Sequence, residues 1–320
     1  MSSSASTSGP VISSGLTPPP TTHRKRSFKR LAEPYFYLSP ALMLLALVMI
    51  LPLVVGLSYA YQNIELLNPF DRGWVGFKHF IALESDRVFW LALKNTFVWT
   101  FGSLGLQFIF GLGLALLLNQ AFYGRKLIQA LVLLPWAVPT FLSGLNWAWL
   151  FNPVISPIPH WLAALGILNE PYNILADPEL AIIGPIVANV WFGIPFFAIT
   201  LMAGLQSIPK DLYEAAVIDG ATLWQQFTRI TLPLLAPIIA ITLLLRTVWI
   251  ANFADLIVVM TNGGPANSSQ TIASYIFSTA YKKLDFGYAS AVATVLLLLL
   301  IIYAALLFGM RKKLLENSGN

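Results

Sequence analysis

The sequence predicts an all-α integral membrane protein with six transmembrane helices, and three observations carry this prediction. Apolar residues make up 57% of the 320 residues and charged residues only 10%, whereas soluble domains carry about 25% charged residues. The apolar residues gather in runs of about twenty or more with few charges, the length that crosses a hydrocarbon core of about 30 Å. These runs are apolar on every side, so each must face lipid or a deep interior.

Six such runs follow one another along the chain. The predicted spans are residues 35–61, 95–118, 127–151, 181–206, 233–260 and 287–310. Ser58-Tyr59-Ala60 loosely resembles a signal-peptide cleavage site, but the first run is longer than the about 7–15 apolar residues of such peptides. We therefore expect the first run to remain as a span. The loop 62–94 is more polar and is expected to carry a short surface helix around Val75–Trp90.

Composition divides the chain into four segments. Residues 1–30 form a Ser-, Thr- and Pro-rich tail that ends in a basic run, and this composition is typical of disorder. Residues 31–94 hold the first spanning helix and an extracytoplasmic loop, residues 95–311 a five-helix core that includes the loop 207–232, and residues 312–320 a C-terminal tail.

Basic residues predict the orientation. If the N-terminus is inside, the inner segments hold 12 of the 19 lysines and arginines, the outer loops hold 6, and Arg246 lies within a span. Because lysine and arginine concentrate in cytoplasmic loops, both termini are predicted to be cytoplasmic. The net charge of +5 arises mainly from these flanks, so it indicates a membrane topology and no nucleic-acid partner.

Several classes of site are excluded or disfavoured by composition. The chain has no cysteine, and His23, His79 and His160 lie far apart, so no metal site is expected. No Gly-x-x-x-x-Gly-Lys-[Ser/Thr] phosphate loop occurs, and the backbone cradle for a nucleotide phosphate is therefore missing from the sequence. Any ATP that drives this protein must be hydrolysed by another polypeptide.

The segment between the fourth and fifth runs has the features of two short helices. Pro209 suits a first helical turn, and Asp211 and Glu214 favour its positive end. Gly220 allows a left-handed turn, and Thr222 can cap a second helix. We predict two short surface helices joined at the glycine, with an apolar edge that needs a partner. An ordinary connector folded back on the bundle is the alternative from these residues alone.

This segment also resembles a known family motif. The pattern Glu214-Ala215-Ala216, Asp219-Gly220-Ala221, Phe227 and Leu232-Pro233 is similar to the EAA loop of the permeases of binding-protein-dependent ABC importers. Further matches to the carbohydrate branch, of the maltose and glycerol-phosphate permease type, are Trp191–Phe196, Leu134–Pro139, Trp147–Pro153 and Thr261–Pro265. The resemblance covers about residues 35–311. It departs at Ile155–His160, where relatives usually carry a glycine and an asparagine.

The resemblance implies a type I ABC importer transmembrane domain in a bacterial inner membrane. Its implied partners are a second permease subunit, ATP-hydrolysing subunits and an extracytoplasmic sugar-binding protein, with the lipid bilayer around it. The chain itself would bind no cofactor, because its partners use the ATP. The residues expected to couple it to the ATPase subunit are Glu214, Ala215, Ala216, Asp219, Gly220, Ala221, Trp224 and Phe227.

Polar and aromatic residues in the fourth and fifth runs are candidates for a substrate pathway. A charged side chain near the centre of a membrane helix costs about 2.5–3.5 kcal/mol on insertion scales, so Arg246 and Asp255 should face the bundle interior or water. The alternative for these charges is a structural pair or a subunit contact. The candidate pathway residues are Asp255, Asn252, Phe253, Trp249, Asn189, Trp191 and Arg246.

The residues alone leave two other functional classes open. A stand-alone secondary transporter or channel would need charge relays or repeated broken helices inside the membrane. A membrane-embedded enzyme would need an acidic or histidine cluster near the interface, and nothing near the close acidic pair of Asp177 and Glu179 completes such a cluster. The sequence does not identify the sugar or the partner permease.

Overall fold

The computed structural model describes residues 28–317, and the chain divides into two compact units, residues 1–53 and 54–320. The helix of the first unit is α1 (Phe28–Leu45), followed by the π-helix η1 (Ala46–Ile50) and by α2 (Leu51–Tyr59), which continues into the second unit. The predicted disordered tail lies almost wholly outside the described residues, as do the last residues of the C-terminal tail.

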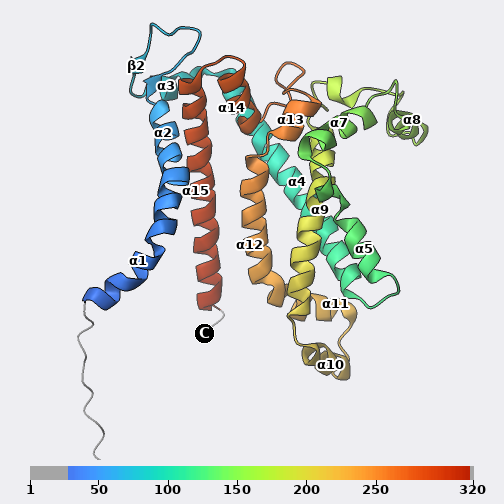
Figure 1. Ribbon diagram of the computed structural model, residues 1–320. Helices are drawn as coiled ribbons and strands as arrows, with labels where there is room; N and C mark the ends of the chain where they lie inside the picture. The colour runs from blue at the N-terminus through green and yellow to red at the C-terminus, as the bar shows by residue number, and fades with distance from the viewer. Residues whose placement is uncertain (1–27, 318–320) are drawn as a thin grey trace, which may run out of the picture. The chain divides into compact units, whose positions relative to one another are not determined.

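The second unit is helical apart from one short hairpin (Figure 1). The strands β1 (Gln62–Asn63) and β2 (Gly73–Trp74) pair antiparallel, with Gln62 opposite Trp74. The helices are α3 (Lys78–Ser85), α4 (Arg87–Asn119), α5 (Arg125–Val132), α6 (Leu134–Ala137), α7 (Thr140–Leu150), α8 (Pro157–Ala164), η2 (Ile174–Ala176), α9 (Ile183–Gln206), α10 (Lys210–Ile218), α11 (Leu223–Gln226), η3 (Phe227–Thr231), α12 (Leu232–Ala251), α13 (Asp255–Met260), α14 (Ile272–Tyr281) and α15 (Phe286–Asn317).

Five of the six predicted spans are helices of membrane-crossing length. Within the described residues, the helices long and apolar enough to span a membrane are Tyr37–Tyr59, Arg87–Asn119, Ile183–Gln206, Leu223–Met260 and Phe286–Leu307. The remaining predicted span, 127–151, is helical but is not one continuous helix, because it is divided into α5, α6 and α7. Val138 has extended backbone (φ −91°, ψ 123°), as expected for a residue that precedes a proline, here Pro139.

One other boundary, the start of the fifth span, differs from the sequence prediction, and the chain passes a proline there. The helix α11 runs through the π-helix η3 directly into α12, so the fifth span begins before Pro233. A proline has no N–H and its ring crowds the carbonyl four residues earlier, and the wider π turn that precedes Pro233 leaves room for this ring. The same arrangement occurs at η1, directly before Leu51-Pro52. The other end of the fifth span agrees with the prediction, because the spanning stretch ends at Met260, although α12 itself ends at Ala251 and the short helix α13 forms the last part.

The largest core of the second unit lies where α4, α9 and α12 meet. Its fully buried side chains include Trp99 of α4, Phe197 of α9 and Leu235 of α12. Trp99 Nε1 donates a hydrogen bond to the Ile250 carbonyl at 2.9 Å. The helices α4 and α9 approach closely at Gly111, where a Cβ atom would lie 2.3 Å from Cβ of Phe197. Small residues at such crossings let helices pack tightly in membranes.

A second cluster forms at the end of the unit that carries the hairpin. Leu83, Phe89, Ile272, Tyr275 and Val292 bring together α3, α4, α14 and α15. The helices α10 and α11 lie at the opposite end of this unit (Figure 1). The surface helix predicted around Val75–Trp90 is present as the shorter α3. Asp86 is the C-cap of α3 and the N-cap of α4, so α3 ends before Trp90.

Asp86 connects three helices of this second cluster. Its carboxylate accepts hydrogen bonds from the backbone amides of Val88 and Phe89, which makes it the N-cap of α4. It also accepts hydrogen bonds from the hydroxyls of Tyr275 and Tyr288, each at 2.6 Å. Burial raises the pKa of Asp86, but the two tyrosine hydroxyls and the two amides lower it more, so this pKa lies below its ordinary value.

Acid is expected to weaken this cluster through Asp86. Because its folded-state pKa is lowered, its stabilisation is complete above the unfolded-state pKa and is lost as the pH falls through the folded-state value. We expect the melting temperature of the detergent-purified protein to fall between pH 5 and pH 3, over about the range of ordinary carboxyl pKa values. Asp86→Asn keeps a helix cap but no charge, so its melting temperature should be lower at pH 7 and should fall less in acid. An equal acid response in both proteins would contradict this assignment.

Candidate functional site

The predicted joint between the two surface helices is a well-formed helix end. In the EAA element (residues 207–232), Gly220 has a left-handed backbone with φ of 78°. The amide of Gly220 donates to the Val217 carbonyl at 3.0 Å, and the amide of Ala221 donates to the Ala216 carbonyl at 2.8 Å. These two bonds form a Schellman motif, which requires a residue that adopts the left-handed conformation without strain. The sequence prediction of a glycine joint is confirmed.

The second helix begins as predicted, with a side-chain cap. The Thr222 hydroxyl accepts from the Gln225 amide, and the Gln225 side chain accepts from the Thr222 amide, so the two residues form a capping box. The Tyr213 hydroxyl lies 2.9 Å from Oγ1 of Thr231, which connects α10 to η3. Because these bonds fix both helices relative to α12, the EAA element is a rigid extension of a spanning helix.

The outer edge of the EAA element is apolar and uncovered. Ile218 is 86% exposed, Leu223 84% and Trp224 71%. A cleft of about 620 Å³ lies between this element and the ends of α4 and α9, with Asn119, Tyr213 and Phe227 among its lining residues. Of the predicted coupling residues, Glu214, Ala215, Asp219, Gly220 and Trp224 are exposed, and Ala216, Ala221 and Phe227 are half-buried.

A buried polar cluster joins the three central helices. Gln107 of α4 is fully buried, and its Nε2 donates to the Asn189 carbonyl of α9 at 2.9 Å. Its Oε1 accepts from Nε of Arg246 of α12 at 2.8 Å. Gly193 makes room for this carboxamide, because a Cβ atom there would lie 2.1 Å from its carbon and oxygen atoms. A single glutamine side chain therefore connects α4, α9 and α12.

Arg246 lies between this glutamine and two aromatic rings. The side chain is only 2% exposed. Its guanidinium carbon lies 5.7 Å from the ring centre of Phe196 and 5.2 Å from that of Trp249. Both distances are within the range of cation–π attraction, about 6 Å.

The two rings belong to an aromatic row built from three helices. The Phe196 ring of α9 lies 6.3 Å from the Trp136 ring of α6 and 6.1 Å from the Trp249 ring of α12. The row is held in place because Trp136 Nε1 donates to the Phe192 carbonyl at 2.9 Å. Trp136 is 40% and Trp249 49% exposed, so the row is partly uncovered while Arg246 is buried beside it.

The other predicted pathway residues lie around this row, although not all of them meet it. Phe253 stacks on Phe192 at 5.8 Å. Asn189 is fully buried, and neither polar atom of its side chain has a hydrogen-bond partner. Trp191 packs edge-on against Trp147 at 6.0 Å. The structure therefore brings Arg246 and Trp249 together, whereas Phe253 pairs with Phe192 and Trp191 with Trp147.

Asn252 and Asp255 lie beyond the end of α12. Asn252 is exposed and donates from Nδ2 to the Val248 carbonyl at 2.8 Å. Asp255 is exposed in the first turn of α13 and accepts from the Thr140 hydroxyl at 2.8 Å. Neither residue contacts Arg246, so the two charges of the fifth span do not form a structural pair.

Sequence reasoning missed three residues of this site, namely Gln107, Trp136 and Phe196. Gln107 is a strongly polar residue in an otherwise apolar run, which is a signal that could have identified it. Trp136 and Phe196 carried no such signal, because aromatic residues are common throughout the chain. Only the packing of α6, α9 and α12 reveals that their rings form a row.

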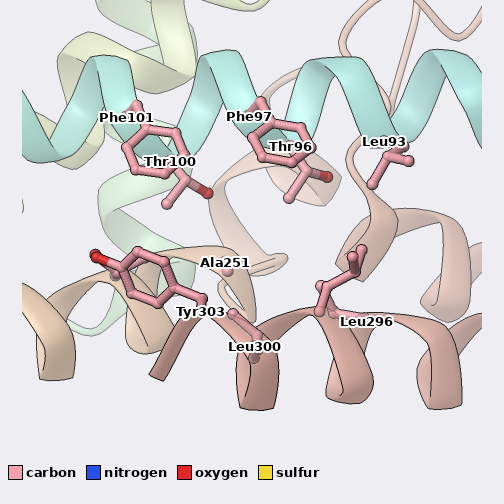
Figure 2. Close-up of a pocket in the computed structure, with 11 residues that line it drawn as sticks. Leu93, Thr96, Phe97, Thr100, Phe101, Ala251, Leu296, Leu300 and Tyr303 are labelled. Atoms are coloured by element: carbon pink, nitrogen blue, oxygen red, sulfur yellow. The ribbon is translucent and has the colours of Figure 1, made fainter. Parts of the chain in front are cut away.

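A separate small hollow lies between α4, α12 and α15. Figure 2 shows Thr96 and Thr100 on one side and Leu300 and Tyr303 on the other. Its volume is about 100 Å³, its lining is mainly apolar, and it contains no charged side chain. This hollow is too small and too apolar to admit a hydrated solute, so it is not a candidate for the substrate pathway. Among the described residues, no group of three or more histidine or acidic side chains could hold a metal ion.

Comparison with known proteins gives a consistent set of matches. Residues 107–312 match the model of the family described as "Binding-protein-dependent transport system inner membrane component". The chain is 36% identical over 269 residues to the trehalose/maltose transport system permease protein MalF of Thermococcus litoralis, covering 84% of this chain and 90% of that protein. It is 35% identical to the sulfoquinovosyl glycerol transport system permease protein SmoG of Agrobacterium fabrum, covering 81% of this chain and 83% of that protein.

A solved structure with the same fold is also similar. A chain of a bacterial ABC transporter involved in the import of the acidic polysaccharide alginate aligns with a TM-score of 0.76 and 27% identity. The alignment covers 89% of this chain and 96% of that chain. The match therefore extends over nearly the whole length of both molecules.

Gln107→Leu should destabilise the protein severely. The substitution removes the acceptor of Arg246 and leaves a buried charge without a hydrogen bond, which typically costs about 3–5 kcal/mol. We expect a strong loss of thermal stability in detergent. Ser103→Ala is the matched control, because Ser103 lies one turn away on α4, is fully buried and makes no side-chain hydrogen bond. Equal melting temperatures for both variants would show that Gln107 does not hold the three helices together.

Proposed function

Because the chain belongs to the family of binding-protein-dependent transport system inner membrane components, we propose that it is the permease subunit of an ATP-driven importer that carries carbohydrates into the cell. The observation that carries this proposal is the EAA element. It is rigid, it continues a spanning helix, and it presents an uncovered apolar edge. Such an edge is what a separate motor subunit could grip.

In this proposal the chain forms part of the transport pathway, and separate partner subunits hydrolyse ATP. It contains no phosphate loop, so separate ATPase subunits would bind the nucleotide and this chain would bind no cofactor. Family membership supports the remaining partners, which are a second permease subunit and an extracytoplasmic binding protein. The family description supports a location in a bacterial inner membrane, and the excess of basic residues on one side supports an orientation with both termini in the cytoplasm.

Force would pass from the ATPase subunits to the membrane through the predicted coupling residues. Glu214 and Asp219 are exposed charges on α10 and its C-cap, and Trp224 projects from α11. Movement of α10 would be transmitted through the hydrogen bond between Tyr213 and Thr231 to η3 and α12. Because α12 carries Arg246 and Trp249, closure of the ATPase pair would change the access to the aromatic row.

The aromatic row is proposed to be the wall along which the carbohydrate passes. Pyranose rings present C–H faces that pack on aromatic rings, and their hydroxyls need hydrogen-bonding groups nearby. The rings of Trp136, Phe196 and Trp249 supply the faces. Phe253, Asn252, Asp255, Asn189 and Trp191 remain proposed members of the pathway, although among the described residues no hydrogen bond or ring contact joins them to the three rings of the row. The relatives that support a carbohydrate are named as permeases for trehalose and maltose and for sulfoquinovosyl glycerol.

The coupling proposal is tested at the glycine joint. Gly220→Val places a branched side chain at φ of 78°, a conformation that such residues avoid, and should distort the Schellman motif between α10 and α11. We expect carbohydrate-stimulated ATP hydrolysis by the reconstituted complex to fall at least about tenfold, while the subunit still inserts in the membrane. Gly166→Val is the control, since Gly166 also has a positive φ, of 72°, but lies in a loop distant along the chain from the EAA element. Normal coupling in Gly220→Val would refute this role.

The exposed apolar edge should be required for assembly. Trp224→Ala removes the largest exposed side chain of the EAA element, and we expect the ATPase subunit to co-purify poorly with this variant. Trp161→Ala removes a comparably exposed tryptophan of α8 and should leave co-purification unchanged. Equal recovery of the ATPase subunit with both variants would remove Trp224 from the contact.

The pathway proposal is tested at Trp249. Trp249→Ala should reduce carbohydrate uptake into proteoliposomes at least about tenfold, because it removes one face of the aromatic row, whereas Trp249→Phe should retain most uptake. The amount of assembled complex is measured in parallel by co-purification. Full uptake by the alanine variant would place the pathway elsewhere.

A further inference from the structure

Arg246 is a charge without a countercharge inside a membrane-spanning helix. It is 2% exposed, and its one hydrogen bond goes from Nε to the neutral amide of Gln107. No hydrogen bond from its two terminal nitrogens and no ion pair is found within the part of the chain that the structure describes. Cation–π attraction to the rings of Phe196 and Trp249 offsets only part of the free-energy cost of removing this guanidinium from water.

The chain offers no carboxylate that could neutralise this guanidinium. Of its 14 acidic residues, only Asp255 belongs to a predicted span, and its carboxylate is exposed and bonded to Thr140. The remaining acidic residues of the described chain lie in loops, in the short helices between spans or at helix ends. A buried charge normally has a partner, so the partner of Arg246 is expected to come from outside this chain.

The position of Arg246 indicates where that partner would lie. The guanidinium lies behind the aromatic row, 5.2 Å from the ring centre of Trp249, and Trp249 is half exposed on its other side. A sugar ring stacked on that outer side would bring a substituent to within about 9 Å of the guanidinium, since stacked groups lie about 4 Å apart. At this separation and an effective dielectric constant of about 20, attraction between opposite charges changes affinity about twentyfold.

We propose that the carbohydrate which crosses at this row is anionic, bearing a carboxylate, phosphate or sulfonate group that the field of Arg246 stabilises. This inference rests on the proposed function and names the substrate class of its site. Arg246 acts through Trp249 and Phe196 as a specificity-determining residue. The bond from Gln107 keeps its guanidinium behind the row, where it attracts anions without obstructing the aromatic faces.

The experiment uses the complete complex in proteoliposomes with its binding protein. Uptake is measured for a panel in which neutral glycans are paired with acidic counterparts, such as galactobiose with digalacturonate, and trehalose with trehalose 6-phosphate. We expect an acidic member to be transported and its neutral counterpart to be transported poorly. For that acidic sugar, Arg246→Gln should raise the half-saturating concentration about tenfold or more, whereas Arg246→Lys, which keeps the charge, should change it less than about threefold.

Controls separate this inference from folding and from the proposed function. Arg87→Gln removes one positive charge from the exposed start of α4 and should leave the half-saturating concentration unchanged. The proposal would be overturned if the complex transported neutral sugars only and if Arg246→Gln lowered the amount of assembled complex while Arg246→Lys restored it. Arg246 would then be a structural contact. Equal effects of Arg246→Gln on a neutral and an acidic sugar would also overturn it. Failure of every carbohydrate in the panel would instead refute the carbohydrate function itself.

Discussion

The arrangement of the central helices depends on one fully buried side chain. Gln107 donates to a backbone carbonyl of α9 and accepts from Arg246 of α12, and Gly193 leaves the space that its carboxamide occupies. A membrane interior offers no water to satisfy polar groups, so this amide orients α9 and α12 around α4. The aromatic row follows from that orientation, because Phe196 and Trp249 are carried by the two helices that Gln107 connects.

The EAA element shows how local chemistry alone can build a rigid element. Its two helices begin and end through hydrogen bonds between residues a few positions apart, including the capping box of Thr222 and Gln225. The π turn of η3 then lets the chain pass Pro233 without a break, so the second short helix and the spanning helix are continuous. Under the proposed function, a connection of this kind would transmit displacement at the surface to Arg246 and Trp249, whereas a flexible connector would absorb it.

The family comparisons and the local geometry constrain different parts of the function. Similarity over most of the chain shows what kind of subunit this is, but relatives of this kind are named for several different carbohydrates. The side chains around the aromatic row are therefore where discrimination between solutes is to be sought. In the proposed pathway, a guanidinium beside partly exposed rings would combine two preferences, since rings favour sugar faces and the charge favours an anion.

Local and compositional signals in the sequence were enough to determine five of the spans, the glycine joint and the capped start of α11. Hydrophobic runs report which residues leave water, and Gly220 and Thr222 act on their immediate neighbours. The break within 127–151 has a local cause at Val138-Pro139, whereas the tertiary structure alone decided that Trp136, Phe196 and Trp249 form a row beside Arg246. The physical reason is that these residues come from three helices distant in sequence, and only helix packing brings their side chains together.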